Sequence, residues 1–313
     1  MSRRRALLPA LAASLALTLA ACGSDSTTDT AEPTGDASGD TTAAATDGKG
    51  SEDDPVVIGV VGASDPQWPL FEQLAEDEGI HVELTNFTDY PSINPALTEG
   101  TLDLNQFQHI LYLAQYNNAT DSDLTIIGDT AIYPMGVYSN EYEDVADIPD
   151  GGEITIPNDP TNQARALFLL QDAGLITLSD DAGTVPDPTD VDTANSRVTV
   201  TPVDANNVVT AITSVDATVV NNDYLKDAGL KATDAIYLEA ATSEGAQPYI
   251  NIWAARSEDA DNETYLTLVE IFDSPEVQEA VQDNADGSAI FANLGLDELA
   301  RVLADEESKL AES

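Results

Sequence analysis

The chain is poor in the residues that most catalytic and nucleic-acid-binding sites use. Its 313 residues include one cysteine, two histidines and 11 lysines and arginines, against 57 aspartates and glutamates, so the formal net charge is −46. A single cysteine cannot form a disulfide within the chain. Nucleic acids and anionic lipid surfaces are themselves negative and would be repelled by so acidic a protein. The charge balance therefore argues against both as partners and favours a highly soluble protein, or one adapted to high salt.

Catalytic sequence motifs are also missing. The sequence contains no G-x-S-x-G nucleophile motif, no H-E-x-x-H zinc motif, no P-loop and no G-x-G-x-x-G loop. The segment Asp283-Asn284-Ala285-Asp286-Gly287 lacks the spacing of a calcium-binding loop. We therefore expect a protein that is not an enzyme and has no catalytic residue, cofactor or metal site. A hydrolase is the least favoured of the alternatives.

The N-terminal residues have the pattern of a secretion signal. Arg3, Arg4 and Arg5 precede a short apolar run that ends in small residues. The segment Leu19-Ala20-Ala21-Cys22 resembles the lipobox of bacterial lipoproteins, in which the cysteine is acylated and becomes the first mature residue. We predict a signal peptide over residues 1–21 and a lipid anchor on Cys22, at the extracytoplasmic face of the bacterial cell membrane. Residues 22–54, rich in small and polar residues, are predicted to be a disordered tether.

From residue 55 onwards, short apolar runs alternate with helical patterns. Residues 56–61 are typical of a strand covered on both faces, and residues 249–255 form another strongly apolar strand. The βαβα order predicts an α/β fold with a largely parallel sheet. We expect two lobes with a ligand cleft between them, residues 55–140 plus 251–313 and residues 141–250. Other predicted elements include strands at 102–107, 132–138 and 217–220 and a helix at 206–214.

The most specific motif is a helix start, Asn158-Asp159-Pro160-Thr161-Asn162-Gln163-Ala164-Arg165. Asp159 is a favourable N-cap, and Pro160 suits the first helical position. A helix N-terminus presents free N–H groups to anions, and an arginine can bind a carboxylate through two hydrogen bonds. Only seven lysines and arginines follow residue 55, and Arg165 is one of them. Arg165 is therefore a candidate carboxylate-binding residue, although the motif alone fits an ordinary surface arginine as well.

Three further segments place polar or aromatic groups near the ends of predicted strands. His109 shares a helix face with Tyr112, and with Phe107 the pair suits an apolar ligand that has polar tips. Asn221 follows a predicted strand, where its amide could hold the head group of an amino acid. Tyr90 lies in a loop between a strand and a helix. The alternatives are a structural histidine, a polar turn and simple packing.

In this order, these segments resemble the NlpA/MetQ family of methionine-binding lipoproteins, which deliver amino acids to ABC importers. The resemblance covers about residues 56–284 and is carried by Asn86-Phe87-Thr88-Asp89-Tyr90, Phe107-Gln108-His109 with Tyr112-Leu113, Ile132-Tyr133-Pro134-Met135-Gly136-Val137-Tyr138-Ser139, the helix-start motif with Ala166-Leu167, Val220-Asn221-Asn222 and Pro248-Tyr249-Ile250-Asn251-Ile252. It implies a two-lobed periplasmic-binding-protein fold that encloses L- or D-methionine between its lobes.

The same resemblance implies a role for each candidate residue. Arg165 would bind the ligand carboxylate and Asn221 the amino-acid head, with Asn162 among the ligand-binding residues. The side-chain pocket would be lined by Tyr90, Phe107, His109 and Tyr112. The implied partner is an ABC permease–ATPase complex, with the membrane reached only through the lipid anchor, no nucleic acid and a monomeric protein. The alternatives are the same fold binding another small amino acid, a dipeptide or oxidised methionine, and an adhesive or scaffolding lipoprotein.

Overall fold

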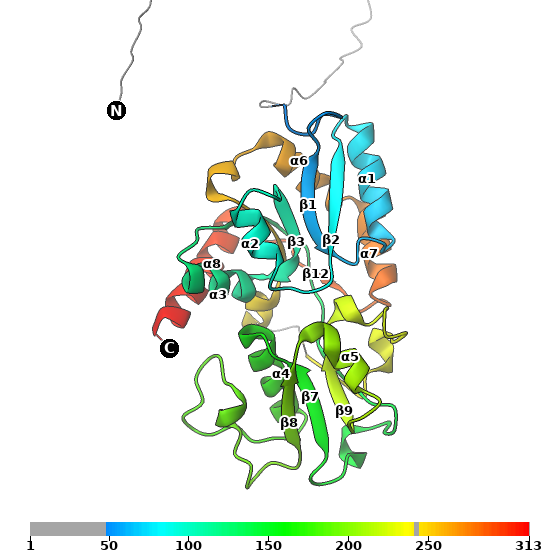
Figure 1. Ribbon diagram of the computed structural model, residues 1–313, viewed down its shortest axis with the longest axis vertical. Coiled ribbons are helices and arrows are strands. Elements are labelled where there is room, and N and C mark those ends of the chain that lie inside the picture. Colours follow the sequence, from blue (N-terminus) through cyan, green and yellow to red (C-terminus); the bar gives the residue numbers. More distant parts are fainter. Residues whose placement is uncertain (1–47, 241–243, 313) are drawn as a thin grey trace, which may run out of the picture. The chain divides into compact units, whose positions relative to one another are not determined.

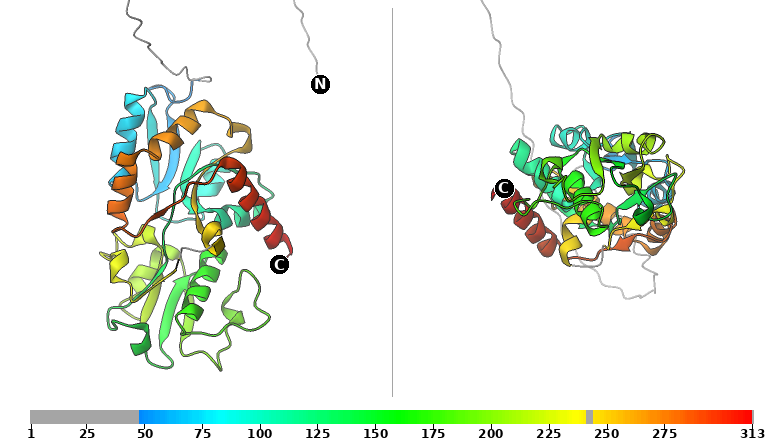
Figure 2. Two further views of the ribbon diagram at one scale, coloured as in Figure 1. Left: turned by 180° about the vertical axis from the view of Figure 1, so that it is seen from behind. Right: turned by 90° about the horizontal axis from the view of Figure 1, so that it is seen from below.

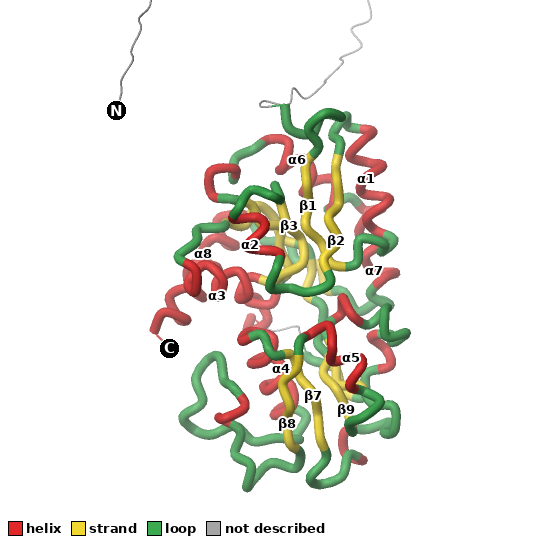
Figure 3. Tube along the Cα trace, viewed as in Figure 1, coloured by secondary structure: helices red, strands yellow, loops and turns green. Residues whose placement is uncertain are grey.

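The computed structural model describes residues 48–240 and 244–312. The predicted signal peptide, Cys22 and most of the predicted tether lie outside these residues. Within them the main strands form two separate five-stranded sheets, seen as two groups of yellow segments in Figure 3. The first sheet has the order β2 (Val82–Phe87), β1 (Val56–Val61), β3 (Leu104–His109), β11 (Asn251–Ala255) and β4 (Thr125–Asp129). The second has the order β10 (Tyr237–Leu238), β6 (Gly136–Tyr138), β9 (Ala217–Val220), β7 (Glu153–Pro157) and β8 (Thr199–Val203).

Helices cover both faces of the first sheet, which with them forms the first lobe (Figure 1). Alternate side chains of β1 enter two different clusters, because successive residues of a strand point to opposite faces. One cluster is shared with α1 (Gln67–Asp77), α6 (Glu263–Phe272) and α7 (Pro275–Asn284). The other is shared with α2 (Ile93–Thr98), α3 (Ile110–Thr120) and α8 (Leu296–Glu312), and Figure 2 shows α8 lying beside α3. None of the helices in the described residues is long and apolar enough to cross a membrane.

Four aromatic side chains form the centre of the first lobe. Trp68 and Phe71 of α1, Trp253 of β11 and Phe272 of α6 are almost fully buried. Their ring centroids lie 5.4 to 6.3 Å apart, mostly edge to face. This is the preferred spacing of aromatic pairs. The cluster ties β11, which comes late in the chain, to the first helix.

The second sheet forms the second lobe with α4 (Pro160–Asp172) and α5 (Val208–Ala211). Ile154 and Ile156 of β7 pack with Leu167 and Leu170 of α4 in a core of their own. The helix predicted over residues 206–214 is wrong in length, since α5 has only four residues and follows a short 3-10 turn. Both sheets are mixed, because β11 runs antiparallel to β3 and β4, and β6 runs antiparallel to β9.

The chain crosses between the lobes within the segment predicted as one strand over residues 132–138. The structure divides it into β5 (Ala131–Ile132), which pairs with β12 (Ile290–Phe291), and β6 in the second sheet. Pro134 lies between them and has no N–H group to donate to a sheet. The second sheet therefore begins at Gly136, before the lobe boundary that the sequence predicted after residue 140.

The last residues of the predicted tether are not separate from the first lobe. His81 donates its N–H to the carbonyl of Gly50 at 2.8 Å, next to the start of β1 and β2. Lys49 Nζ lies 2.9 Å from Asp54 and 3.1 Å from the buried Asp103. A lysine that holds two carboxylates fixes the chain here, so the ordered domain begins several residues before the predicted position 55.

Candidate functional site between the two sheets

His109 ends β3 and caps the helix that follows. Its Nδ1 accepts the backbone N–H of Tyr112 at 3.1 Å, so the proton of the neutral ring lies on Nε2. That Nε2 is 3.4 Å from Oδ1 of Asn162 in the second lobe. Burial, together with the charge of Arg165, lowers the pKa of His109 to about 3. His109 is therefore a neutral hydrogen-bond donor at physiological pH.

The helix start at Asp159 is confirmed, and its N-cap positions Asn162. Asp159 Oδ1 accepts the backbone N–H of Asn162 at 3.0 Å and its side-chain amide at 2.9 Å, and Pro160 is the first residue of α4. The Oδ1 atom of Asn162 in turn accepts Nδ2 of Asn221 at 2.9 Å. Asn221 is only 8% exposed, and its Oδ1 atom has no hydrogen-bond partner among the described residues. The network thus leaves one buried acceptor free.

Arg165 is buried, but it already has a carboxylate partner within the protein. Its Nε and Nη2 atoms donate to the two oxygens of Glu239 at 3.0 and 2.5 Å, and Nη2 also donates to the carbonyl of Tyr133 at 3.0 Å. The guanidinium carbon lies 4.4 Å from the ring centroid of Tyr249. Because Nη1 has no hydrogen-bond partner in the described part of the chain, its two N–H groups remain for a ligand. Glu239 fixes the plane of the guanidinium group and neutralises its charge.

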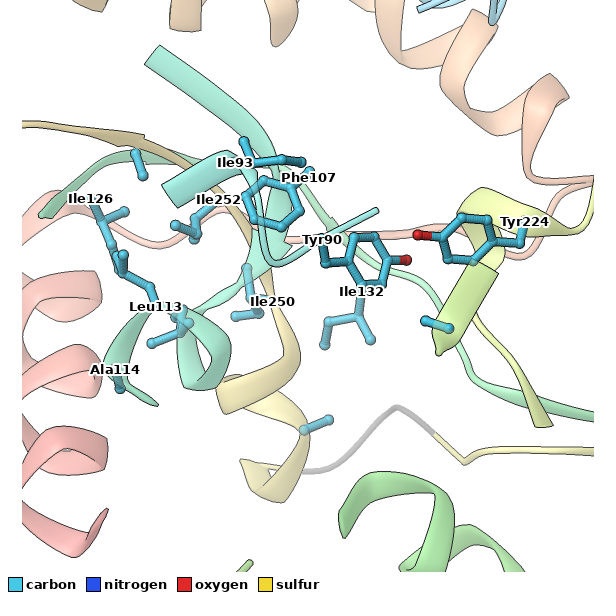
Figure 4. Packing of buried hydrophobic residues seen from close by; sticks show 14 of the residues in the cluster. Tyr90, Ile93, Phe107, Leu113, Ala114, Ile126, Ile132, Tyr224, Ile250 and Ile252 are labelled. Atoms are coloured by element: carbon cyan, nitrogen blue, oxygen red, sulfur yellow. The ribbon is translucent and has the colours of Figure 1, made fainter. Parts of the chain in front are cut away.

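Aromatic rings form the wall beside this polar network. The ring of Tyr90 lies between Phe107 and Tyr224, with centroid distances of 5.7 and 5.3 Å (Figure 4). Tyr112 lies 6.2 Å from the rings of both Tyr90 and His109, edge to face. Tyr224 belongs to the second lobe and the others to the first, so the aromatic wall crosses from one lobe to the other.

Asp223 joins the two lobes from the other side. The Tyr90 hydroxyl donates to Asp223 Oδ2 at 2.8 Å, and the Asn222 amide donates to Oδ1 at 2.8 Å. Burial, opposed in part by the hydrogen bond from Tyr90 and reinforced by the charge of Asp65, raises the pKa of Asp223 to about 7. Asp65 itself pairs with Lys226 across the lobes at 2.6 Å. The lobes therefore meet through several polar contacts.

All seven predicted site residues line one cavity between the lobes, together with Gln108, Asn222, Asp223 and Asn251. Its volume is about 20 Å³, which leaves room for about one water molecule. A neighbouring cavity of about 450 Å³, within the usual range for ligand pockets, shares Phe107, Asn222, Asp223 and Asn251 with it. No group of three or more His, Cys, Asp or Glu side chains within residues 48–240 and 244–312 is arranged to hold a metal ion.

A model of the NlpA lipoprotein family matches residues 56–292. The chain belongs to this family. The D-methionine-binding lipoprotein MetQ of Escherichia coli strain K12 is 34% identical over 246 residues, which are 76% of this chain and 89% of that protein.

Solved structures agree with the two-lobed fold. Protein PG110 from Staphylococcus aureus is 37% identical, with a TM-score of 0.77 over 80% of this chain and 99% of that chain. A nutrient binding protein from Burkholderia cenocepacia bound to methionine is 34% identical, with a TM-score of 0.70 over 76% of this chain and 100% of that chain. The predicted family and fold class are thus confirmed. The relatives from Escherichia coli and Burkholderia cenocepacia are named as binding proteins, as expected for a chain that is not an enzyme.

Two charged residues of this NlpA-family protein were not predicted from its sequence. Glu239 pairs with Arg165, and Asp223 faces both cavities without a cationic partner among the described residues. Neither lies in a distinctive acidic motif, and the sequence gives no reason to single out one acidic residue among 57. Asn222-Asp223 directly follows Asn221 after β9, so the end of this strand was the one sequence signal that pointed toward Asp223.

Proposed function

We propose that this chain is the substrate-binding protein of an ABC importer and binds methionine between its lobes. The observation that carries the proposal is the shared cavity of Arg165, Asn162, Asn221 and His109, with the aromatic residues alongside. The relatives support it, because they include a D-methionine-binding lipoprotein and a structure bound to methionine. The free Nη1 of Arg165 would donate a charge-assisted hydrogen bond to the ligand carboxylate.

The aromatic residues suit the remainder of methionine. A thioether sulfur is attracted to aromatic rings at a distance of about 5 Å. Tyr90, Phe107 and Tyr112 together present such rings at the edge of the polar network. His109 would donate a hydrogen bond from Nε2 without adding charge. Because the cavity is nearly filled when the lobes are in contact, the ligand enters while the lobes are apart, and binding is a hinge closure.

The transport role requires an anchored protein outside the cytoplasmic membrane. Cys22 would carry the lipid, residues 23 to about 47 would form the tether, and the monomeric domain would deliver its ligand to the permease and ATPase. The membership in a lipoprotein family supports the anchor. The Cys22→Ser variant should lose the lipid label that the wild type carries. If the variant retained the label, this assignment would be contradicted.

The volume of the neighbouring cavity favours one alternative ligand class. A space of about 450 Å³ that shares four residues with the site could accept a larger methionine derivative, including a dipeptide or an oxidised methionine. Dipeptides and methionine sulfoxide therefore belong among the competing ligands of any binding test.

Calorimetric titration tests the proposal directly. The mature protein would be unfolded, dialysed free of bound ligand, refolded and titrated with L- and D-methionine. We expect saturable heat with a micromolar or lower Kd for at least one enantiomer. If neither enantiomer gives heat, while the refolded protein has the native circular dichroism, methionine is not the ligand.

A further inference from the structure

Of the charged side chains that line the small cavity, Asp223 is the one whose charge is not balanced by another described residue. Eight lysines and arginines fall in the described residues, and each of them forms an ion pair with an aspartate or glutamate. None of these pairs includes Asp223. Its partners are a phenol and an amide, from Tyr90 and Asn222. A carboxylate placed between two lobes in this way is costly unless a cation arrives from outside.

The position of Asp223 places it in the path of a ligand. It lines the small cavity with Arg165 and Asn221, and it also lines the neighbouring cavity of about 450 Å³. A ligand that binds Arg165 and extends into the larger space therefore passes the residues that both cavities share, and Asp223 is the one charged residue among them. A carboxylate offers about four lone-pair positions, and the hydrogen bonds from Tyr90 and Asn222 use two of them.

A second free acceptor lies close to Asp223 in the chain. Asn221 Oδ1 is buried and has no hydrogen-bond partner among the described residues, and the bond from Nδ2 of the same side chain to Asn162 fixes its orientation. When Asp223 is ionised, its free lone pairs and Asn221 Oδ1 offer the cavity acceptors and no donors. An ammonium group has three donors and no acceptor, so it satisfies both side chains at once.

We propose that Asp223, helped by Asn221, binds the α-ammonium group of the ligand and makes the cleft selective for amino acids whose amino group is free. This inference rests on the proposed function and adds a recognition element for the amino group, which methionine carries on the same carbon atom as its carboxylate. Arg165 with its partner Glu239 is neutral before the ligand arrives, so the ligand carboxylate alone would add to the negative charge of Asp223. A zwitterion brings the compensating cation with it.

The test compares two ligands and four proteins by calorimetric titration. Methionine is compared with 4-(methylthio)butanoate, which retains the carboxylate and the thioether but lacks the amino group. The proteins are the wild type, Asp223→Asn, Tyr90→Phe and Asp283→Asn. The asparagine variant still accepts the hydrogen bond of Tyr90, so it removes charge with little change of shape.

The two control variants separate charge recognition from structure. Tyr90→Phe removes one of the hydrogen bonds between the lobes but leaves the charge of Asp223 in place, so methionine should remain the preferred ligand even where both ligands bind more weakly. Asp283→Asn removes the same charge from the wall of the larger cavity, where the residue is exposed, and should leave the ratio of the two affinities within about twofold.

The wild type should bind methionine about 10- to 100-fold more tightly than 4-(methylthio)butanoate, and Asp223→Asn should reduce that ratio by about tenfold or more. An unchanged ratio in Asp223→Asn, with methionine still bound by the wild type, would overturn the inference and leave the proposed function standing. No methionine binding by the wild type would remove both.

Discussion

The two charged ends of the site differ in how far the protein completes them. At Arg165 the charge is neutralised by Glu239, the plane of the guanidinium group is fixed by two hydrogen bonds, and only Nη1 remains open. At Asp223 the hydrogen bonds come from neutral groups, and no lysine or arginine in the part of the chain that the structure describes pairs with its charge. The cationic end is thus preorganised before binding, whereas the anionic end is balanced only when a ligand is present.

Because of this difference, substitutions at Arg165 and at Asp223 should change stability and affinity in different ways. Removing a partner from a buried pair leaves an uncompensated charge, so changes at the Arg165 end should lower stability as well as affinity. Neutralising Asp223 removes a charge that the ligand-free protein accommodates poorly, so stability and affinity should move in opposite directions there. A loss of stability for variants at the Arg165 end and a gain for Asp223→Asn would confirm that only the Arg165 end is balanced before the ligand binds.

The largest effect is expected for Glu239→Gln. The substitution leaves the Arg165 guanidinium buried without a countercharge, and the free energy of unfolding should fall by about 3–5 kcal/mol. Denaturant unfolding of the ligand-free protein measures this. The control is Glu298→Gln, which breaks an exposed pair with Arg301 and should change stability little. Equal, small losses in both variants would show that the buried pair contributes no more than a surface pair.

Arg165→Lys should have the next largest effect. A lysine keeps the positive charge for Glu239 but loses the planar pair of N–H groups at Nη1. We expect methionine affinity to fall by about 2–3 kcal/mol, roughly 30- to 150-fold. Calorimetric titration measures the affinity, and circular dichroism checks the fold. Full affinity in a folded Arg165→Lys protein would rule out recognition of the carboxylate by Nη1.

Asp223→Asn should stabilise the ligand-free protein by about 1–2 kcal/mol at pH 8. The pKa of Asp223 is about 7 in the folded protein, above its ordinary value, so folding penalises the ionised form fully above pH 7. As the pH falls from 7 towards 4, the folded wild type binds a proton and the penalty disappears. The advantage of the variant should therefore shrink in that range. A variant less stable than wild type at pH 8 would contradict this sign.

The smallest effect concerns His109. Its pKa is lowered to about 3 by burial and by the charge of Arg165, so its ring should stay neutral from pH 8 to pH 5. Its ring-proton NMR signals should keep their chemical shifts over this range. A titration of His109 near pH 6.5 would mean that the ring is solvated and that the described contacts with Asn162 do not persist in solution.

Much of the framework is encoded locally and was predictable. The N-cap Asp159 with Pro160, and the continuous apolar run of β1, depend only on neighbouring residues and the period of the pattern. The division of residues 132–138 between two sheets was not predictable from apolarity, because the same run continues across the crossing. Only Pro134 marked the interruption.

The candidate site was predictable in part for the same reason. The predicted side chains follow strand ends or start a helix, and the structure brings all seven into one cavity. Glu239 lies 74 residues after Arg165. No sequence pattern near either residue indicates that the fold brings the two side chains into contact. Asp223 is distinguished by having no cationic partner within residues 48–240 and 244–312, which depends on how the chain folds and not on any motif.

A crystal structure of the methionine complex tests the central claim most directly. We predict the ligand carboxylate within about 2.7–3.2 Å of Arg165 Nη1, with the Arg165–Glu239 pair intact, and the ligand ammonium at the same distance from an oxygen of Asp223. A ligand bound the other way round, or an ammonium group that approaches neither Asp223 nor Asn221, would contradict the account.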